Sequence, residues 1–253
     1  MKTSLYIRVM IAGLIICSIF QFAQAEVRLP KVLSNNMVLQ RNVELKIWGW
    51  ANRGEKVLVQ FKDQEVTTKT RKNGQWQVTL KPMEAGGPYS MTISGKNVIT
   101  LENILIGDVW VCSGQSNMEW SVSNSNHADE EIENADHPNI RLFTAPRAVD
   151  KRPSSDLTSG EWMVCSPENI PDFSAVGYFF GRHLNNELDV PIGLINTSWG
   201  GTNIETWTST EALENIAGFE EPLELLKTFD PEKERAARQK KVEDLTGPLP
   251  DED

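Results

Sequence analysis

The chain has 253 residues, 40% of them hydrophobic and 24% charged, which is typical of a globular, soluble protein with one large domain or two modest ones. Its 35 Asp and Glu residues outnumber its 25 Lys and Arg residues, giving a formal net charge of -10 at pH 7. Nucleic-acid surfaces need basic clusters, and no basic run follows the N-terminal segment, so we exclude nucleic acid as a partner.

Residues 1–25 have the pattern of a secretory signal peptide. A positive start precedes an apolar run over residues 9–20, and Ala23-Gln24-Ala25 offers small residues where a signal peptidase cuts. The run is too short for a stable membrane span. A lipoprotein attached at Cys17 is the alternative, although Ile16 precedes it where a small residue is expected. We therefore expect an exported chain, periplasmic or extracellular, with no membrane span after cleavage.

Residues 26–106 predict a small antiparallel β-sandwich. Apolar and polar residues alternate with a period of two, the mark of strands with one buried face. The apolar positions are Val43, Leu45 and Ile47; Val57, Val59 and Phe61; Trp76, Val78 and Leu80; and Met91 and Ile93. Asn73-Gly74 lies between two such runs and predicts a hairpin. This module contains no nucleophile arrangement or metal cluster, so we expect it to be structural or to orient a substrate.

After residue 106 the pattern changes to strands that alternate with helices. The expected strands lie at residues 109–112, 140–143, 162–165 and 192–196, and the expected helices at 128–135 and 174–188. Such alternation indicates an α/β domain with parallel strands, which we place at residues 107–218. Thr208 and Glu211 form a possible capping box for a further helix.

Residues 219–253 form a charged tail with a predicted solvated helix at 232–245, where Asp230 is the expected N-cap and Pro231 lies in the first turn. Two cysteines follow residue 25, and each lies in an apolar run. We expect Cys112 and Cys165 to be separate buried thiols, with a disulfide as the alternative.

Ser116 is the candidate nucleophile. It follows the strand at 109–112 in a Gly-containing turn before a helix, a geometry that can expose a serine beside backbone amides able to hold an oxyanion. A simple turn serine is the alternative. Gly200-Gly201 follows the strand at 192–196, and ligand sites gather at the carboxyl ends of parallel strands. These glycines offer a second amide for the oxyanion, or form a plain turn.

Several blocks of this sequence are similar to those of one enzyme family. They are Asn36-Met37-Val38-Leu39-Gln40-Arg41, Trp48-Gly49-Trp50-Ala51, Asn73-Gly74-Gln75-Trp76, Gly107-Asp108-Val109-Trp110, Ser113-Gly114-Gln115-Ser116-Asn117-Met118-Glu119-Trp120, Phe173-Ser174-Ala175-Val176-Gly177-Tyr178, Pro191-Ile192-Gly193-Leu194-Ile195-Asn196, and Ser198-Trp199-Gly200-Gly201-Thr202 with Glu205 and Trp207. With these blocks the chain resembles the sialate O-acetylesterase family, carbohydrate esterases of the SGNH-hydrolase class.

The resemblance implies a flavodoxin-like three-layer α/β domain behind a β-sandwich. It also implies hydrolysis of O-acetyl esters on sialic acid or related sugars through an acetyl-enzyme, without a metal or another cofactor. Ser116 would be the nucleophile, and the amides of Ser116 and of Gly201 or Gly200 would form part of the oxyanion hole. The implied substrate-binding residues are Gln115, Asn117, Met118 and Trp120. Met118 and Trp120 could equally be core residues.

The sequence also departs from the family pattern. A later Gln-Gly-Glu-Ser-Asn block and the Asp-x-x-His block that supplies the base are both absent, and His127, His137 and His183 lack an Asp three residues upstream. We therefore expect an incomplete α/β domain with an unpaired sheet edge, and weak or no activity. The alternatives are a non-catalytic sugar-binding remnant of the family, or another ester hydrolase such as an acetylxylan esterase or a lipase.

Overall fold

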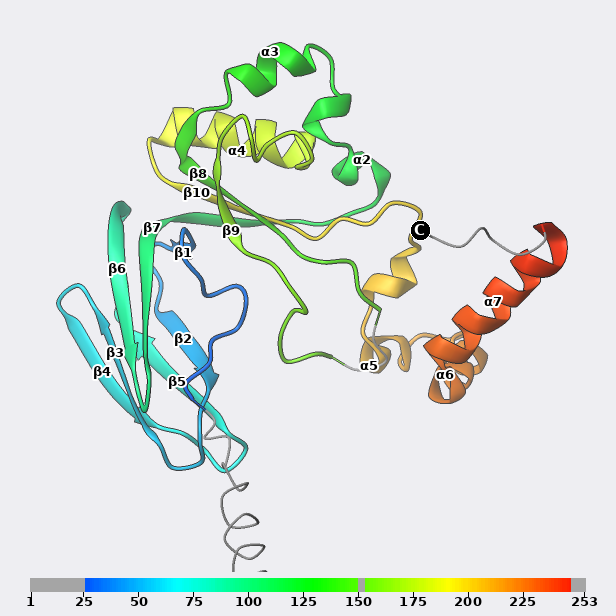
Figure 1. Cartoon of the computed structure of the whole chain (residues 1–253), viewed down its shortest axis with the longest axis horizontal. Coiled ribbons are helices and arrows are strands. Elements are labelled where there is room, and N and C mark those ends of the chain that lie inside the picture. Colours follow the sequence, from blue (N-terminus) through cyan, green and yellow to red (C-terminus); the bar gives the residue numbers. More distant parts are fainter. Residues whose placement is uncertain (1–25, 150–152, 247–253) are drawn as a thin grey trace, which may run out of the picture.

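The computed structural model describes residues 26–149 and 153–246, so the predicted signal peptide lies outside the described residues. The chain has a mixed α/β fold with an eight-stranded mixed sheet and a two-stranded antiparallel sheet (Figure 1). Within the described ranges, no helix is long and apolar enough to cross a membrane.

The N-terminal part consists of strands from both sheets. They are β1 (Val38–Gln40), β2 (Leu45–Trp50), β3 (Lys56–Phe61), β4 (Gln64–Lys69), β5 (Gln75–Leu80), β6 (Gly86–Ser94) and β7 (Val98–Cys112). Strands β4, β3, β6 and β7 are neighbours in the large sheet, whereas β2 pairs only with β5. One hydrophobic core joins the two sheets. The apolar positions predicted from the alternation are buried in it, except Val43, which precedes β2 and is 46% exposed.

The predicted hairpin at Asn73-Gly74 is wrong. Strand β4 was not expected, and it forms a hairpin with β3 through a turn in which Lys62 has a φ of 52°. The chain then turns at Gly74, which has a φ of +80°, and enters β5 in the other sheet. Asn73-Gly74 is thus a turn between sheets. The alternation that reveals other strands is missing in β4 because none of its residues is fully buried.

Strand β7 runs without a break through the predicted domain boundary at residues 106 and 107. Its first part pairs with β6 on one side and, at residues 105–107, with β1 on the other. Residues 108–112 pair with β10 (Ile192–Asn196), which lies beside β8 (His137–Thr144). Both pairings are parallel, as predicted, whereas β9 (Trp162–Cys165) is antiparallel to β8.

Two of the α-helices cover one face of this parallel part of the sheet (Figure 1). They are α3 (Ala128–Glu133) and α4 (Ala175–Leu188), and α4 packs on a second hydrophobic core. The Ser174 side chain caps α4 by accepting a hydrogen bond from the Gly177 amide, 3.1 Å away. The predicted helix at 174–188 is therefore confirmed, with Ser174 as its N-cap.

The remaining helices follow β7 or β10, and most of them are short. They are α2 (Ser116–Glu119), the 3-10 helices η1 (Val122–Asn124) and η2 (Ile204–Trp207), and α5 (Thr210–Leu213), α6 (Glu220–Thr228) and α7 (Pro231–Thr246). The cap of α5 is Ser209, which accepts from the Ala212 amide, so the Thr208 box was placed one residue early. The Asp230 carboxylate accepts from the Lys233 amide, which confirms the predicted cap of α7.

The open edge of the sheet lies along residues 108–112 of β7. Among the described strands, this segment pairs only with β10, and Trp110 and Val111 are 44% and 65% exposed. At the start of this segment, Arg41 binds both carboxylate oxygens of Asp108 at 2.8 and 2.9 Å, and the Gln40 side chain accepts a hydrogen bond from the Val109 amide at 2.8 Å. These contacts join the two parts of the molecule. The apolar, unpaired edge agrees with the expectation from sequence.

Candidate active site

The turn after β7 exposes Ser116. Gly114 has a φ of +151°, and a Cβ there would lie 3.2 Å from that of Met118, so the turn requires glycine. The chain then enters α2 at Ser116, whose side chain is exposed. The Ser116 hydroxyl has no hydrogen-bond partner among the described residues.

The segment that follows β10 is fastened to this turn. The Thr197 amide donates to the Cys112 carbonyl at 2.9 Å, and the Trp199 amide donates to the Gly114 carbonyl at 3.0 Å. A Cβ on Gly200 would lie 3.5 Å from the Ser116 Cα and would collide with the Glu119 carboxylate. The two strand ends therefore meet as the sequence predicted, and Gly200 allows the close approach.

Gly200 and Gly201 differ in what their amides face. The Gly200 amide donates to the Glu119 carboxylate, which also forms an ion pair with Arg147. Gly201 is exposed with a φ of +74°, and within the described part of the chain its amide has no hydrogen-bond partner. Of the two glycines among the predicted oxyanion donors, Gly201 thus has a free amide, whereas the Gly200 amide is held by a carboxylate.

An open hollow of about 420 Å³ lies beside Ser116. It is lined by Ser116, Glu119, Trp120, Ser121, Asn124, Arg147 and Asp172. Trp120 is 56% exposed, and its indole Nε1 donates to the Asn124 carbonyl at 2.9 Å. That hydrogen bond fixes an exposed aromatic face beside the nucleophile candidate, an arrangement suited to stacking on a sugar ring.

The other predicted substrate-binding residues do not line this hollow. Gln115 and Asn117 are exposed. Met118 packs against the second core, and its sulfur Sδ lies 3.4 Å from the Ser174 hydroxyl. The core alternative for Met118 therefore fits its surroundings better than a substrate contact does.

None of the three histidines lies at the hollow. Strands β7, β10 and β8 are aligned so that Cys112, Asn196 and Thr144 are level at the end of the sheet nearest Ser116. His137 begins β8, seven residues earlier, which is roughly 23 Å away along a strand. His127 is the N-cap residue of α3 and His183 lies in α4, and both side chains are exposed. Within the described residues, none of the three is positioned as the base of Ser116.

The cysteines are both free and buried, as expected. Burial raises the pKa of the Cys112 thiol, and it raises the pKa of Cys165 from 9.0 to about 12. Thiols held in the neutral form are poor nucleophiles, so neither competes with Ser116 for this role. Among the described residues, no group of three or more His, Cys, Asp or Glu side chains could hold a metal ion.

Sequence reasoning missed the charged residues of the hollow. Arg147 comes three residues after the end of β8, the third parallel strand, so the strand-end rule that located Ser116 and Gly200 could also have located it. Glu119 follows Ser116 by one helical turn, and its carboxylate reaches across to β10's exit. Asp172 lies before the cap of α4 and gives no comparable signal.

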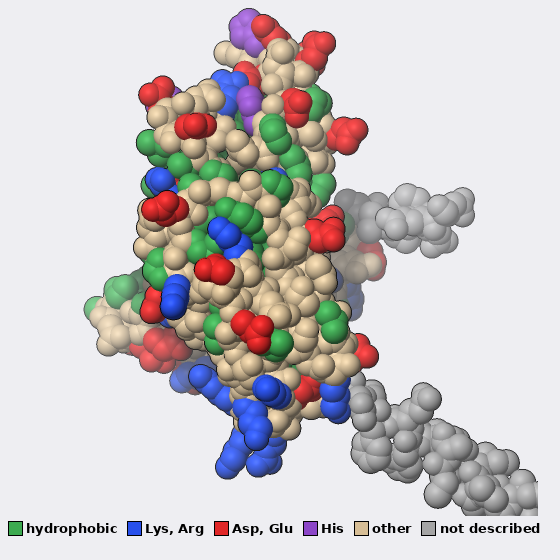
Figure 2. Space-filling model, turned by 90° about the vertical axis from the view of Figure 1, so that its left-hand side faces the viewer, with side chains coloured by type: hydrophobic (Ala, Val, Ile, Leu, Met, Phe, Trp, Pro, Cys, Tyr) green, Lys and Arg blue, Asp and Glu red, His purple; other side chains and the backbone are tan. Residues whose placement is uncertain are grey.

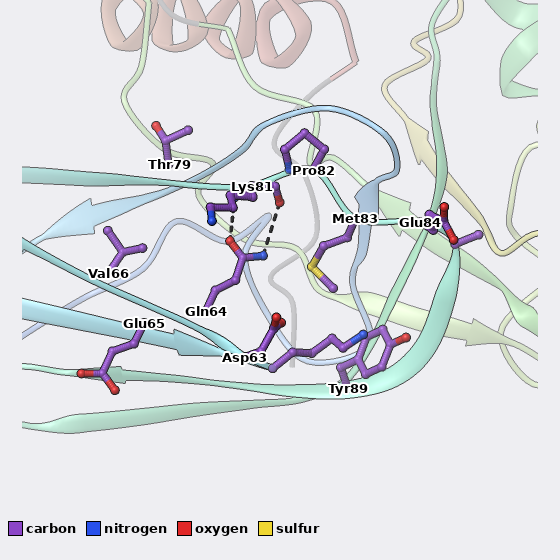
Figure 3. A pocket seen from close by; sticks show the side chains of 12 residues that line it. Asp63, Gln64, Glu65, Val66, Thr79, Lys81, Pro82, Met83, Glu84 and Tyr89 are labelled. Atoms are coloured by element: carbon purple, nitrogen blue, oxygen red, sulfur yellow. Dashed lines mark hydrogen bonds between the residues drawn. The ribbon is translucent and has the colours of Figure 1, made fainter.

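A larger hollow of about 690 Å³ lies on the N-terminal part, away from Ser116 (Figure 3). Its walls come from the β3–β4 turn, the start of β4, the end of β5 and the following loop. Gln64 exchanges two hydrogen bonds with the Lys81 backbone, and the Lys62 ammonium lies 4.5 Å from the centre of the Tyr89 ring. This hollow contains no serine, cysteine or histidine, so it offers no esterase chemistry.

Comparisons with known proteins point to one family of esterases. Residues 106–224 match the family model described as "Carbohydrate esterase, sialic acid-specific acetylesterase". The chain is 34% identical to the sialate O-acetylesterase of Mus musculus over 220 residues, covering 79% of this chain and 41% of that protein. It is also 34% identical to that of Homo sapiens over 206 residues, covering 74% of this chain and 39% of that protein.

A solved structure is similar as well. The carbohydrate acetylesterase from Xanthomonas citri superimposes with a TM-score of 0.73 at 36% identity, covering 74% of this chain and 43% of that one. The chain thus spans about two fifths of the length of the curated relatives that it matches.

Proposed function

The chain belongs to the sialic acid-specific acetylesterase family of carbohydrate esterases, and from this premise we propose that it acts on O-acetyl esters of sialic acid or related sugars. The observation that carries the proposal is the meeting of two parallel strand ends, which brings Gly200 against Ser116 beside a hollow with an exposed tryptophan. A serine, a free amide and an aromatic face are three of the groups that an acetyl-sugar esterase needs at its reacting centre.

In the proposed reaction, the Ser116 oxygen Oγ attacks the acetyl carbonyl carbon. The amides of Ser116 and Gly201 donate to the resulting oxyanion, the bond from the acetyl carbon to the sugar oxygen breaks, and that oxygen takes the proton lost by Ser116. Water then hydrolyses the acetyl-serine to acetate and restores the Ser116 hydroxyl. The Gly200 amide joins the two donating amides if the Glu119 carboxylate moves away. Trp120 stacks on the sugar, whereas Gln115 and Asn117 are exposed beside Ser116 but do not line the hollow.

The hydroxyl proton of Ser116 needs a base, and among the described residues no side chain is hydrogen-bonded to this hydroxyl and no histidine lines the hollow. Triads that lack a member keep only roughly 10³- to 10⁴-fold acceleration over water. Losing one oxyanion donor costs about another 10²- to 10³-fold. We therefore propose that this chain by itself has weak or no esterase activity, and that full activity needs a His–Asp pair supplied from elsewhere.

We also propose that the α/β part is an incomplete three-layer domain of the flavodoxin-like type, preceded by a β-sandwich. Helices cover one face of its parallel strands, and the edge at residues 108–112 is open within the described residues, which supports this proposal. The predicted signal peptide makes export part of the proposal. A secreted or periplasmic product that begins at Glu26 would support it, and a product that keeps residues 1–25 would contradict it.

The test of the nucleophile is release of p-nitrophenol from p-nitrophenyl acetate by the purified chain. We expect a low rate that falls to the uncatalysed level in Ser116→Ala. Ser113→Ala, which changes an exposed serine in the same turn, serves as the matched control and is expected to keep the rate. Equal rates for the unmodified chain and Ser116→Ala would rule out Ser116 as the nucleophile of this chain.

A second candidate function is sugar binding without catalysis. It is favoured by the Glu119 carboxylate on the Gly200 amide and by the position of the histidines, none of which lines the hollow within the described residues. In this case Ser116→Ala binds O-acetylated sialic acid as well as the unmodified chain does, and Trp120→Ala binds it more weakly. Calorimetric titration of both variants would decide, and no detectable binding to either Ser116→Ala or the unmodified chain would count against it.

A further inference from the structure

The end of the N-terminal part farthest from the parallel strands is strongly basic. Three turns meet there, at residues 50–56, 69–75 and 94–98, and they contain six cations and one acid. The cations are Arg53, Lys56, Lys69, Arg71, Lys72 and Lys96, all exposed. Figure 2 shows Lys and Arg side chains gathered at the lower end of the molecule. We call these six residues the basic tip.

The cations of the basic tip are not neutralised by ion pairs within the described residues. Lys56 and Lys69 lie directly opposite each other on β3 and β4, where like charges repel. The one acid, Glu55, accepts from the backbone amides of Asn52 and Lys96 at 3.1 and 2.7 Å. In a chain with a net charge of -10, this segregation creates a local positive field at one end.

A small hollow with the chemistry of a sugar site adjoins the basic tip. It has a volume of about 100 Å³ and is lined by Trp48, Arg71, Gln75, Trp76 and Gln77. Arg71 belongs to both the hollow and the tip. Trp48 is half-buried opposite Gln77 in the β2–β5 ladder. An aromatic ring beside amide groups suits a sugar, whose ring stacks and whose hydroxyl groups exchange hydrogen bonds.

Two further observations distinguish this hollow from ordinary surface. The indole Nε1 of Trp76 is buried and has no hydrogen-bond partner in the described part of the chain, which is a costly arrangement for a donor. Trp50, the neighbour of Trp48 on the same face of β2, has its ring covered by the Arg28 guanidinium at 4.4 Å. The two sequence blocks that contain these tryptophans have no part in the site at Ser116.

We propose that the basic tip and the adjoining hollow form a second binding site, which holds an acidic carbohydrate chain. The hollow takes a sugar ring against Trp48, and the six cations attract the carboxylate groups along the chain. The site is separate from Ser116, but the choice of an acidic sugar rests on the proposed function. Its role is to hold the protein on a polymer that carries the ester substrate.

An anionic membrane fits the basic tip less well. Proteins that bind membrane surfaces insert large apolar side chains beside the basic residues. Among the described residues of the three turns, Val98 is the one large apolar side chain that is exposed. Nucleic acid is disfavoured by the negative charge of the rest of the molecule.

The charge arm of the test measures binding of the full chain to immobilised polysialic acid. We expect Lys56→Glu/Lys69→Glu to weaken binding about tenfold or more, and binding to fall between about 0.1 and 1 M salt as the Debye length shortens from ~10 to ~3 Å. The matched control is Lys46→Glu/Lys81→Glu, which makes the same charge change at exposed sites outside the tip. Equal weakening by both variants, or no binding at all, would overturn the proposal.

The sugar arm separates a carbohydrate site from a merely charged surface. We expect Trp48→Ala and Gln75→Ala/Gln77→Ala to weaken binding of polysialic acid and to leave binding of poly-L-glutamate unchanged. Preference for poly-L-glutamate, or binding to phosphatidylglycerol vesicles without binding to polysialic acid, would overturn the proposal. Ser116→Ala is expected to bind polysialic acid as the unmodified chain does, so failure of the esterase assay leaves this result interpretable.

Discussion

Strand β7 passes through two regions that are built differently. Its first part lies between β6 and β1 and contributes to a core closed by a second sheet. Its last part, residues 108–112, pairs with β10 alone among the described strands and exposes Trp110 and Val111. The candidate nucleophile follows the less supported part. The site at Ser116 thus follows a segment with a strand partner on one side only, whereas the N-terminal strands enclose a core that also takes in Phe143 and Trp162 from β8 and β9.

The largest expected effect lies in the closed core. Phe61 is fully buried and packs edge-on against Tyr89. We expect Phe61→Ala to lower the free energy of unfolding by about 3–5 kcal/mol, because a cavity remains where the ring was. Urea denaturation would measure it, with Val111→Ala on the open edge as the control, expected to stay within about 0.5 kcal/mol. Similar losses for both variants would show that the two regions do not differ in this way.

The second prediction concerns how the free energy of unfolding depends on pH. It involves the thiols of Cys112 and Cys165, which are both buried in the second core. In the folded state, burial raises the pKa of the Cys165 thiol from its ordinary value of 9.0 to about 12. As pH rises, the thiol therefore ionises at a lower pH in the unfolded chain than in the folded one. Stability is fully present below about pH 9 and declines as pH rises toward 12, by up to about 1.4 kcal/mol per pH unit.

Urea titrations at pH 8 and pH 10.5 would check this decline. Cys165→Ala is expected to flatten it without abolishing it, because burial also raises the pKa of Cys112 and, together with the charge of Cys165, raises that of Tyr178 to about 12. An unchanged slope in Cys165→Ala would contradict the assignment to this thiol.

The third prediction tests the contact that joins the two regions. Arg41 and Asp108 form a two-point ion pair, and their side chains are 29% and 17% exposed. In a double-mutant cycle with Arg41→Gln and Asp108→Asn, we expect a coupling energy of about 1 kcal/mol. The control cycle uses Lys227 and Glu224, an exposed pair on α6 that is expected to show no measurable coupling. Equal coupling energies in both cycles would show that the Arg41–Asp108 pair contributes no more to stability than an exposed ion pair does.

The smallest effect on stability is expected at the open edge. Val111→Lys removes exposed apolar surface from the open edge of β7, so it should change the free energy of unfolding by less than about 0.5 kcal/mol. Self-association at high protein concentration should decrease, because unpaired edges and apolar patches favour it. Sedimentation velocity would measure the change, and identical sedimentation of Val111→Lys and the unmodified chain would mean that this edge does not mediate association.

The sequence predicts the strands and helices that have one apolar, buried face and one polar, exposed face. The alternation in β3 and β5 gave their buried positions, and the amphipathic pattern with Ser174 gave α4. Strand β4 escaped because neither of its faces is fully buried, so its residues show no apolar alternation. The partner of β5 could not be read from Asn73-Gly74, because the same turn can join paired strands or lead the chain to another sheet.

The site was predictable where it follows from chain direction. Parallel strands place their carboxyl ends together, which brought Ser116 and Gly200 into contact as expected. The state of each amide was not predictable, because the Glu119 side chain reaches Gly200 from a position set by three-dimensional packing. The pair of Glu119 with Arg147 likewise depends on how two separate strand exits converge.

The long strand β7 also sets a delay during synthesis. Asp108 pairs with Ile192, so 84 residues separate the last part of β7 from its partner. At about 5–20 residues per second, the ribosome makes that stretch in roughly 4–17 s. The N-terminal core can close during this time, while Trp110 and Val111 wait for β10. The segment that leads to Ser116 is therefore the last part of the strand to gain its partner strand in the newly made protein.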